Sequence, residues 1–182
     1  MNYCFSPANM AKLSSDWIVR KGPMLRKQIL EHPAVTPIPA GEINVTEVAT
    51  VLVTSETADH PIDNVFDGRR GPGGSRWVAE KPGEQTLILA FDAPQMIHKI
   101  TLEVEEPAIS RTQELALSLS KDGGQTYREV VRQEFNFSPP GTAFEREHWT
   151  VSADLVTHLR LWIKPDKGNH ACKATLTSLA LQ

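Results

Sequence analysis

The sequence predicts an all-β protein: an antiparallel β-sandwich of the jelly-roll type with a short helical extension at its N-terminus. Three observations predict this fold. From Asn44 onward, short segments with alternating apolar and polar residues follow one another to the end of the 182-residue chain. Turn signals rich in Gly, Pro, Asn and Asp separate these segments about every ten residues, which is typical of a sandwich or barrel. No helical pattern alternates with them, which argues against a parallel α/β sheet.

The N-terminal residues show a different pattern, with an apolar stripe at helical spacing. Met10, Leu13 and Trp17 lie three and four residues apart, which predicts one apolar face on a helix at residues 7–19. A second short helix is expected at residues 24–31. The arm is too short to build its own core, so its stripe packs either on its own domain or on another protein.

A proline-rich linker follows these helices and ends before the first predicted strand. We therefore divide the chain into an N-terminal arm with its linker, residues 1–44, and a β-sandwich domain, residues 45–182. Met10, Leu13 and Trp17 are candidate partner-binding residues, because Trp is enriched among binding anchors. Homo-oligomerisation through the arm is one role that this stripe would serve.

The predicted strands are separated by recognisable turns. Asp92-Ala93-Pro94 is expected to turn the chain between two strands, and Asp122-Gly123-Gly124 is expected to form a hairpin turn. Residues 61–66 are expected to form a helical turn. A short strand is expected around Trp77, and the other predicted strands cover residues 45–54, 86–91, 97–105, 115–120, 127–135, 147–152, 158–164 and 176–181.

Trp162 stands out within the strand at residues 158–164. The alternation places it on the face opposite Leu161 and Ile163, between Arg160 and Lys164. An outward Trp flanked by cations is a candidate partner-binding anchor. The interpretation that we favour is that the N-terminal helix covers it, so that Trp17 and Trp162 share one interface.

Composition excludes several functional classes. A net charge of −3 without a basic stripe argues against a nucleic-acid binder. No apolar run approaches the roughly 20 residues needed to span a bilayer, so no membrane association is expected. The two cysteines form no disulfide framework and residues 1–7 lack a signal-peptide pattern, so a cytoplasmic location is expected.

The residues also give little support to catalysis. Asp59-His60 and Glu145-x-Glu147-His148 are the polar clusters that invite it. Glu147 and His148 are adjacent on a predicted strand and therefore point to opposite faces. Metal-ligand spacings such as Cys-x-x-Cys are absent, and the glycine-rich segment at residues 71–74 lacks the features of a phosphate-binding loop. We predict that the protein is not an enzyme, with a small hydrolase as a remote alternative.

An ordered set of motifs resembles the discoidin, or coagulation-factor C-type, superfamily of galactose-binding-like β-sandwiches. The resemblance covers residues 45–182. Its elements are Pro61-x-x-Asn64-Val65-Phe66-Asp67-Gly68, Ser75-x-Trp77 where the family usually has Thr-x-Trp, Asp92-x-Pro94, Ile97-x-Lys99-Ile100-x-Leu102, and Leu117-Ser118-Leu119-Ser120-Lys121-Asp122-Gly123 followed by Tyr127. Members of this superfamily bind sugars, phospholipids, peptides and proteins, so the resemblance implies the fold and leaves the ligand open.

The resemblance implies a structural calcium site near Asp67 and Ser75, but this chain departs from the pattern. Arg69 stands where an Asp or Asn is common, and Ser178 stands where the family usually has Glu. Losing carboxylates and gaining a guanidinium disfavours calcium, which prefers six to eight oxygen ligands. We expect a degenerate site without a cofactor, in which Arg69 or Arg70 makes a bidentate contact with Asp67.

Sugar-binding members of the superfamily use loops at one end of the sandwich. By position, the resemblance places Arg111, Gln113 and the pair Asn169-His170 at that end, and His60 is a further candidate in a nearby loop. The sugar binders tend to have a His after the Trp of Thr-x-Trp, where this chain has Val78. An aromatic residue is also expected before the last strand, where His170 is the nearest residue.

These observations favour a non-catalytic recognition module that mediates protein–protein interaction or assembly through the sandwich loops and the arm. The arm and the missing sugar-stacking aromatics support that interpretation. The alternative is a carbohydrate-binding module that uses His60, Arg111, Gln113, Asn169 and His170. The partner is accordingly a protein or a glycan.

Overall fold

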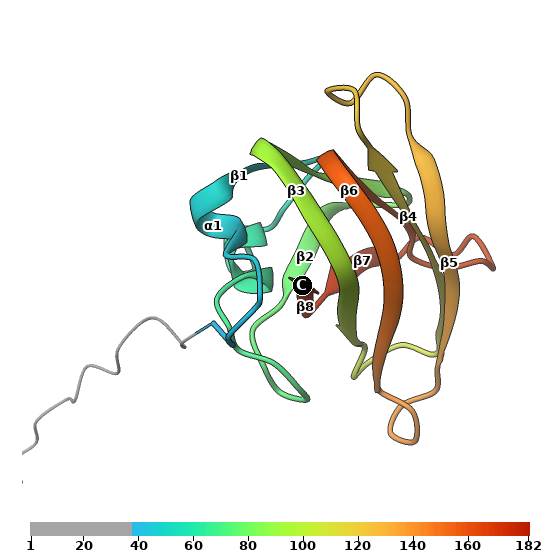
Figure 1. The fold of residues 1–182 in the computed structure, drawn as a ribbon. Coiled ribbons are helices and arrows are strands. Elements are labelled where there is room, and N and C mark those ends of the chain that lie inside the picture. The colour runs from blue at the N-terminus through green and yellow to red at the C-terminus, as the bar shows by residue number, and fades with distance from the viewer. Residues whose placement is uncertain (1–37) are drawn as a thin grey trace, which may run out of the picture. The chain divides into compact units, whose positions relative to one another are not determined.

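A computed structural model describes residues 38–182, and within them it confirms the predicted antiparallel β-sandwich (Figure 1). The arm residues Met10, Leu13 and Trp17 lie outside the described part of the chain. The elements are α1 (Val45–Val48), β1 (Ala49–Val53), η1 (Ile62–Val65), β2 (Trp77–Pro82), β3 (Gln85–Glu105), β4 (Arg111–Ser120), β5 (Arg128–Phe137), β6 (Phe144–Lys164), β7 (Lys173–Leu176) and β8 (Ser178–Leu181).

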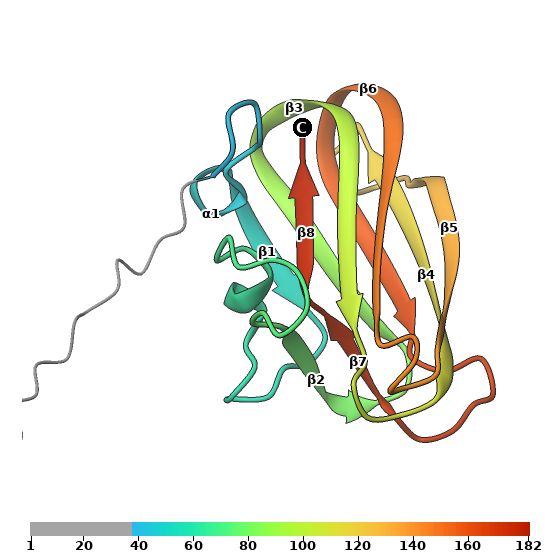
Figure 2. The same cartoon turned by 90° about the horizontal axis from the view of Figure 1, so that it is seen from below.

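Two long strands, β3 and β6, connect the layers of the sandwich. The first half of β3 pairs with the last half of β6 within the larger sheet, whose strand order is β1-β3-β6-β4-β5. Their other halves pair with each other again, and β8 adds to β3 there. Strands β2 and β7 form a separate antiparallel pair. Figures 1 and 2 show β3 and β6 running side by side along the molecule.

The core forms from the inward positions of these alternating strands. Leu161 of β6 lies opposite Leu87 of β3 on one side and Leu117 of β4 on the other, and all three side chains are fully buried. Such a cross-strand row shows why the leucines recur at every second residue. No helix within the described residues is long and apolar enough to cross a membrane.

The first predicted strand is correct only in its second half. Residues 45–48 form the helical turn α1, and the strand begins at Ala49. Val45 is buried against the core, so tertiary packing outweighs the preference of its β-branched side chain for a strand.

Four predicted strands are two long ones in the structure. Residues 86–91 and 97–105 both belong to β3, and residues 147–152 and 158–164 both belong to β6. The predicted turn at residues 92–94 instead lies where β3 has no partner residues on β6, between Ala90 and Gln95. Pro94 is tolerated there because it removes no interstrand hydrogen bond.

Candidate functional site

The loop end of the sandwich contains a cavity of about 390 Å³. The turn between β2 and β3 forms one wall, and the loop between β6 and β7 forms the other. Its polar lining consists of Glu84, Lys164, Asp166, Asn169 and His170. The cavity therefore presents two carboxylates, an ammonium, an amide and an imidazole from two neighbouring loops.

Asp166 and His170, which both line this cavity, are joined by hydrogen bonds. The Asp166 carboxylate is buried and lies 2.5 Å from Nδ1 of His170, and it also accepts the His170 main-chain N–H at 3.1 Å. Burial raises the pKa of the Asp166 carboxyl, but hydrogen bonds from His170, Gly168 and Thr112 outweigh it and lower the pKa to about 2. Asp166 is therefore an anion at neutral pH.

This carboxylate fixes the tautomer and the orientation of the imidazole. An ionised carboxylate only accepts hydrogen bonds, so Nδ1 of His170 carries a proton and Nε2 faces away from Asp166. The His170 side chain is 85% exposed despite this anchor. An exposed ring held by a buried carboxylate is a pre-oriented group for ligand binding.

Gly168 makes the close approach between the two side chains feasible. A Cβ atom at this position would lie 2.9 Å from Oδ2 of Asp166 and 3.0 Å from Nδ1 of His170. Any side chain here would displace the ring or the carboxylate. Asn169 follows in the left-handed backbone region, with φ of 60°, and the loop thus exposes its amide beside His170.

The structure places Arg111 and Gln113 at the same end but inside the protein. Arg111 forms an ion pair with Glu106 at 2.7 Å and donates to the main-chain oxygen of Lys173 at 2.6 Å. Gln113 is fully buried and donates to the main-chain oxygen of Thr175 at 3.3 Å. Neither side chain lines the cavity, and their role in ligand binding stays a prediction.

The alternation of β4 contained the signal for this burial. Arg111 and Gln113 lie at every second residue before Leu115, Leu117 and Leu119, so they share the inward face of the strand. The resemblance assigned them to the loops, whereas the period of two assigns them to the interior. Glu106, the partner of Arg111, lies five residues before it and shows no pattern of its own.

His60 lies near this end but away from the cavity. Its main-chain N–H donates to Thr57, and its oxygen accepts the N–H of Val78 at 3.1 Å. Val78 in turn lies opposite Thr175 of β7. Of the five predicted ligand-binding residues, Asn169 and His170 therefore line the cavity together, whereas His60, Arg111 and Gln113 do not.

Sequence reasoning missed Glu84, Lys164 and Asp166. For Asp166 a signal existed: it stands four residues before His170 in a polar Gly-containing loop, a spacing at which the two side chains meet here. Glu84 belongs to a turn 80 residues earlier in the chain than Lys164, and only the pairing of β3 with β6 brings them together.

Trp162 lies beside the cavity on the outer face of the larger sheet. Its indole N–H donates to the Glu84 carboxylate at 3.2 Å, and the Arg132 guanidinium lies 5.6 Å from the ring centroid. The ring is only half-buried. The predicted outward orientation is confirmed, whereas a partner bound to Trp162 stays a prediction.

The residues around Asp67 do not fit a calcium ion. Asp67 accepts the Ser75 hydroxyl at 2.5 Å and the Arg69 main-chain N–H at 2.8 Å. Within the described chain, no set of three or more His, Cys, Asp or Glu side chains is arranged to hold a metal. The expected bidentate contact from Arg69 or Arg70 to Asp67 is wrong, because Arg70 pairs with Glu42 instead.

Main-chain N–H groups of this loop bind two carboxylates of β3. Gly71 N–H donates to Glu103 at 2.7 Å, and Gly73 N–H donates to Glu105 at 3.0 Å. Arg146 also donates to the buried Glu103 carboxylate, at 2.6 Å. Both carboxylates thus accept hydrogen bonds from the protein, whereas a calcium ion requires six to eight oxygen ligands around it.

Comparisons with known proteins identify the fold. No family model matches the sequence, and no curated protein matches it. A solved pectin-binding carbohydrate-binding module is 19% identical, covers 74% of this chain and 90% of its own, and superposes with a TM-score of 0.54. The family 32 module of Clostridium perfringens NanJ, solved with galactose, is 15% identical over 77% of this chain and 96% of its own, with a TM-score of 0.54.

A third structure of this kind is the family 32 module of AlyQ in complex with 4,5-unsaturated mannuronic acid. It is 16% identical, covers 74% of this chain and 95% of its own, and has a TM-score of 0.51. These similarities show that residues of the described sandwich adopt the discoidin-like, galactose-binding-like fold predicted from the sequence motifs. At such low identity they establish the fold alone.

Proposed function

We propose that this protein is a non-catalytic carbohydrate-binding module whose ligand site is the loop-end cavity around His170. One observation carries the proposal: an exposed imidazole is pre-oriented by the buried Asp166 carboxylate within a concave, polar loop cluster. Sugar hydroxyls both donate and accept hydrogen bonds. The cavity offers an acceptor in Glu84, a donor in Lys164 and both functions in Asn169.

The solved structures with this fold support the same function. Their descriptions include a pectin-binding module and complexes with galactose and with a uronic acid. This support ranks carbohydrate binding above the protein-assembly function that the arm favoured. The arm and its stripe lie outside the described residues, so assembly through Met10, Leu13 and Trp17 remains a separate proposal.

A glycan array tests the proposal. We expect the full chain to bind a defined set of glycans, from a panel that includes galactose, N-acetylgalactosamine and uronic acid termini. The His170→Ala variant should lose binding by about tenfold or more, because it removes an oriented hydrogen-bonding ring. His148→Ala is the matched control, since His148 is exposed in the first half of β6, opposite Thr101 of β3 and outside the lining of the cavity.

The array also discriminates against the proposal. If no glycan binds, or if His170→Ala and His148→Ala bind equally well, the loop-end cavity is not a sugar site. Binding that disappears in both variants alike would point to a different surface and would also count against it.

A further inference from the structure

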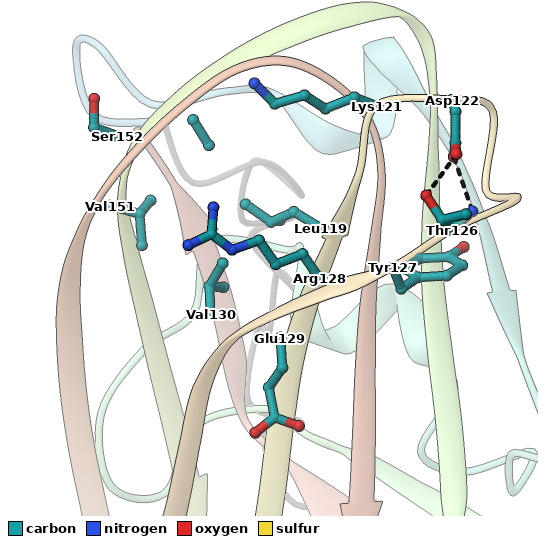
Figure 3. Close-up of a pocket in the computed structure, with 11 residues that line it drawn as sticks. Leu119, Lys121, Asp122, Thr126, Tyr127, Arg128, Glu129, Val130, Val151 and Ser152 are labelled. Carbon is teal, nitrogen blue, oxygen red and sulfur yellow. Dashed lines mark hydrogen bonds between the residues drawn. The ribbon is translucent and has the colours of Figure 1, made fainter.

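A second concave surface lies at the opposite end of β4, between the β4–β5 hairpin and the middle of β6 (Figure 3). We call it the hairpin hollow. It has a volume of about 680 Å³, within the range of about 300–1,000 Å³ typical of small-molecule sites. Its apolar floor consists of Leu119, Val130, Val151 and Ala153.

The floor is an uncovered edge of the hydrophobic core. Val151 and Ala153 of β6 are partly buried and pack against the core, and Leu119 of β4 is 6% exposed. In this stretch β6 pairs with β3 alone, and β5 pairs with β4 alone. No described strand therefore closes the gap between β5 and this part of β6.

A β-bulge lies at the side of the hollow. Val131 lies opposite Leu117 and Glu129 lies opposite Ser118, so Val130 has no partner residue on β4. Val130 is 36% exposed, which is unusual for an aliphatic side chain beside a core. Bulges are over-represented at sheet edges and next to active sites, where they redirect a side chain.

Among the described residues, the charges around the hollow leave one cation without an acidic partner. Lys121 pairs with Asp154, Glu129 pairs with Arg132, and Asp122 accepts the Thr126 hydroxyl at 2.6 Å. Arg128 is exposed and has no acidic side chain within 4 Å among residues 38–182. Figure 3 shows its guanidinium extending from β5 between Leu119 and Val151.

We propose that the hairpin hollow binds a small amphiphilic carboxylate. The carboxylate would accept two parallel hydrogen bonds from the Arg128 guanidinium, which has the planar donor geometry for such a contact. The apolar body of the ligand would cover Val130, Val151 and their neighbours, which burial from water favours. This site is independent of the loop-end cavity and of its glycan.

An extended peptide is the less favourable occupant. The free edge of β5 carries Arg128, Arg132 and Glu134, and the bulge at Val130 interrupts its regular backbone. Edge charges and bulges are the features with which β-proteins prevent a further strand from adding. A compact amphiphile requires none of these backbone hydrogen bonds.

Nitrogen-15 NMR titration of the full chain with octanoate tests the proposal. We expect saturable shift changes at the amides of residues 119, 128–130 and 151–153. Octan-1-ol lacks the carboxylate and acetate lacks the apolar body. Each should therefore bind with an affinity at least about tenfold lower than that of octanoate. Arg128→Gln should weaken octanoate binding to a similar extent.

Three further proteins make the result decisive. Lys173→Gln removes a charge on β7 that faces Glu80 of β2, outside the lining of the hollow, and should bind octanoate as the wild type does. His170→Ala should also bind normally. Ala153→Leu should weaken binding by partly filling the floor. Equal affinity of octanoate and octan-1-ol, unchanged binding by Arg128→Gln, or shift changes confined to the loop end would each overturn the proposal.

Discussion

His170 at the candidate site depends on a carboxylate four residues earlier in the chain. The pKa of Asp166 is about 2 in the folded protein, below its value of about 3.9 in an unfolded chain. The folded protein therefore stabilises the ionised form of the Asp166 carboxyl relative to the unfolded chain. The resulting stabilisation is complete above pH 4 and is lost as the pH falls toward 2.

The Asp166→Asn variant tests this linkage. We expect it to be less stable than the wild type at pH 7, because the hydrogen bonds to the carboxylate weaken. The difference in free energy of unfolding should shrink between pH 4 and pH 2, where the wild type loses the same charge. Urea unfolding at a series of pH values measures it, and a difference independent of pH would contradict the account.

Arg111 and Glu106 form a second residue-scale unit, buried beside the candidate site. Glu106→Gln keeps the acceptor for the N–H groups of Ala108 and Ile109 but removes the charge that faces Arg111. An unpaired buried guanidinium should destabilise the fold by about 3–5 kcal/mol.

Chemical denaturation of Glu106→Gln measures this loss. The double variant Glu106→Gln with Arg111→Met is the control, since it removes the unpaired charge as well and should regain most of the stability. If Glu106→Gln is as stable as the wild type, Arg111 is not held by this ion pair.

Strand β6 determines the architecture at the scale of the elements. Leu161 is fully buried between β3 and β4, whereas the neighbouring Arg160 lies on the outer face over the Tyr127 ring, at 4.2 Å. Leu161→Ala should cost about 2–5 kcal/mol, because it leaves a cavity in the core.

The adjacent residue supplies the comparison for β6. Arg160→Ala should cost under about 1 kcal/mol, since it removes one partly exposed cation–π contact. Thermal or urea unfolding of both variants measures the contrast. Similar losses for the two variants would mean that the assigned register of β6 is wrong.

The sequence predicted the strands better than their connections. Alternation identified the segments at residues 86–91 and 97–105 correctly, but Asp92 and Pro94 indicated a turn where β3 continues. Local turn preferences do not show whether the two halves of a long strand pair with the same neighbouring strand. In β3 they do, because β6 bends alongside it.

The candidate site was predictable only in part, for a similar reason. Asn169 and His170 are close in sequence to Asp166, so one loop brings them together. Glu84 reaches the same cavity through the register of β3 with β6, which no local pattern encodes. Arg111 and Gln113 followed the strand alternation into the interior rather than the expected loop position.

At the scale of the whole molecule, the loop that follows Asp67 is held by carboxylate acceptors of the protein itself. Gly68 adopts φ of 79°, which permits the turn, and the Glu103 and Glu105 carboxylates bind the N–H groups beyond it. We expect added calcium or a chelator to leave the melting temperature of the protein unchanged. Scanning calorimetry checks this, and an increase of several degrees with calcium would contradict it.

The central claim is that the loop-end cavity binds a glycan. The most direct measurement is a nitrogen-15 NMR titration of the full chain with the strongest glycan from the array. The account predicts saturable shift changes at the amides of residues 83, 84, 164 and 166–171, which enclose His170. Shift changes centred elsewhere on the sandwich, or no saturable change with any glycan, would contradict it.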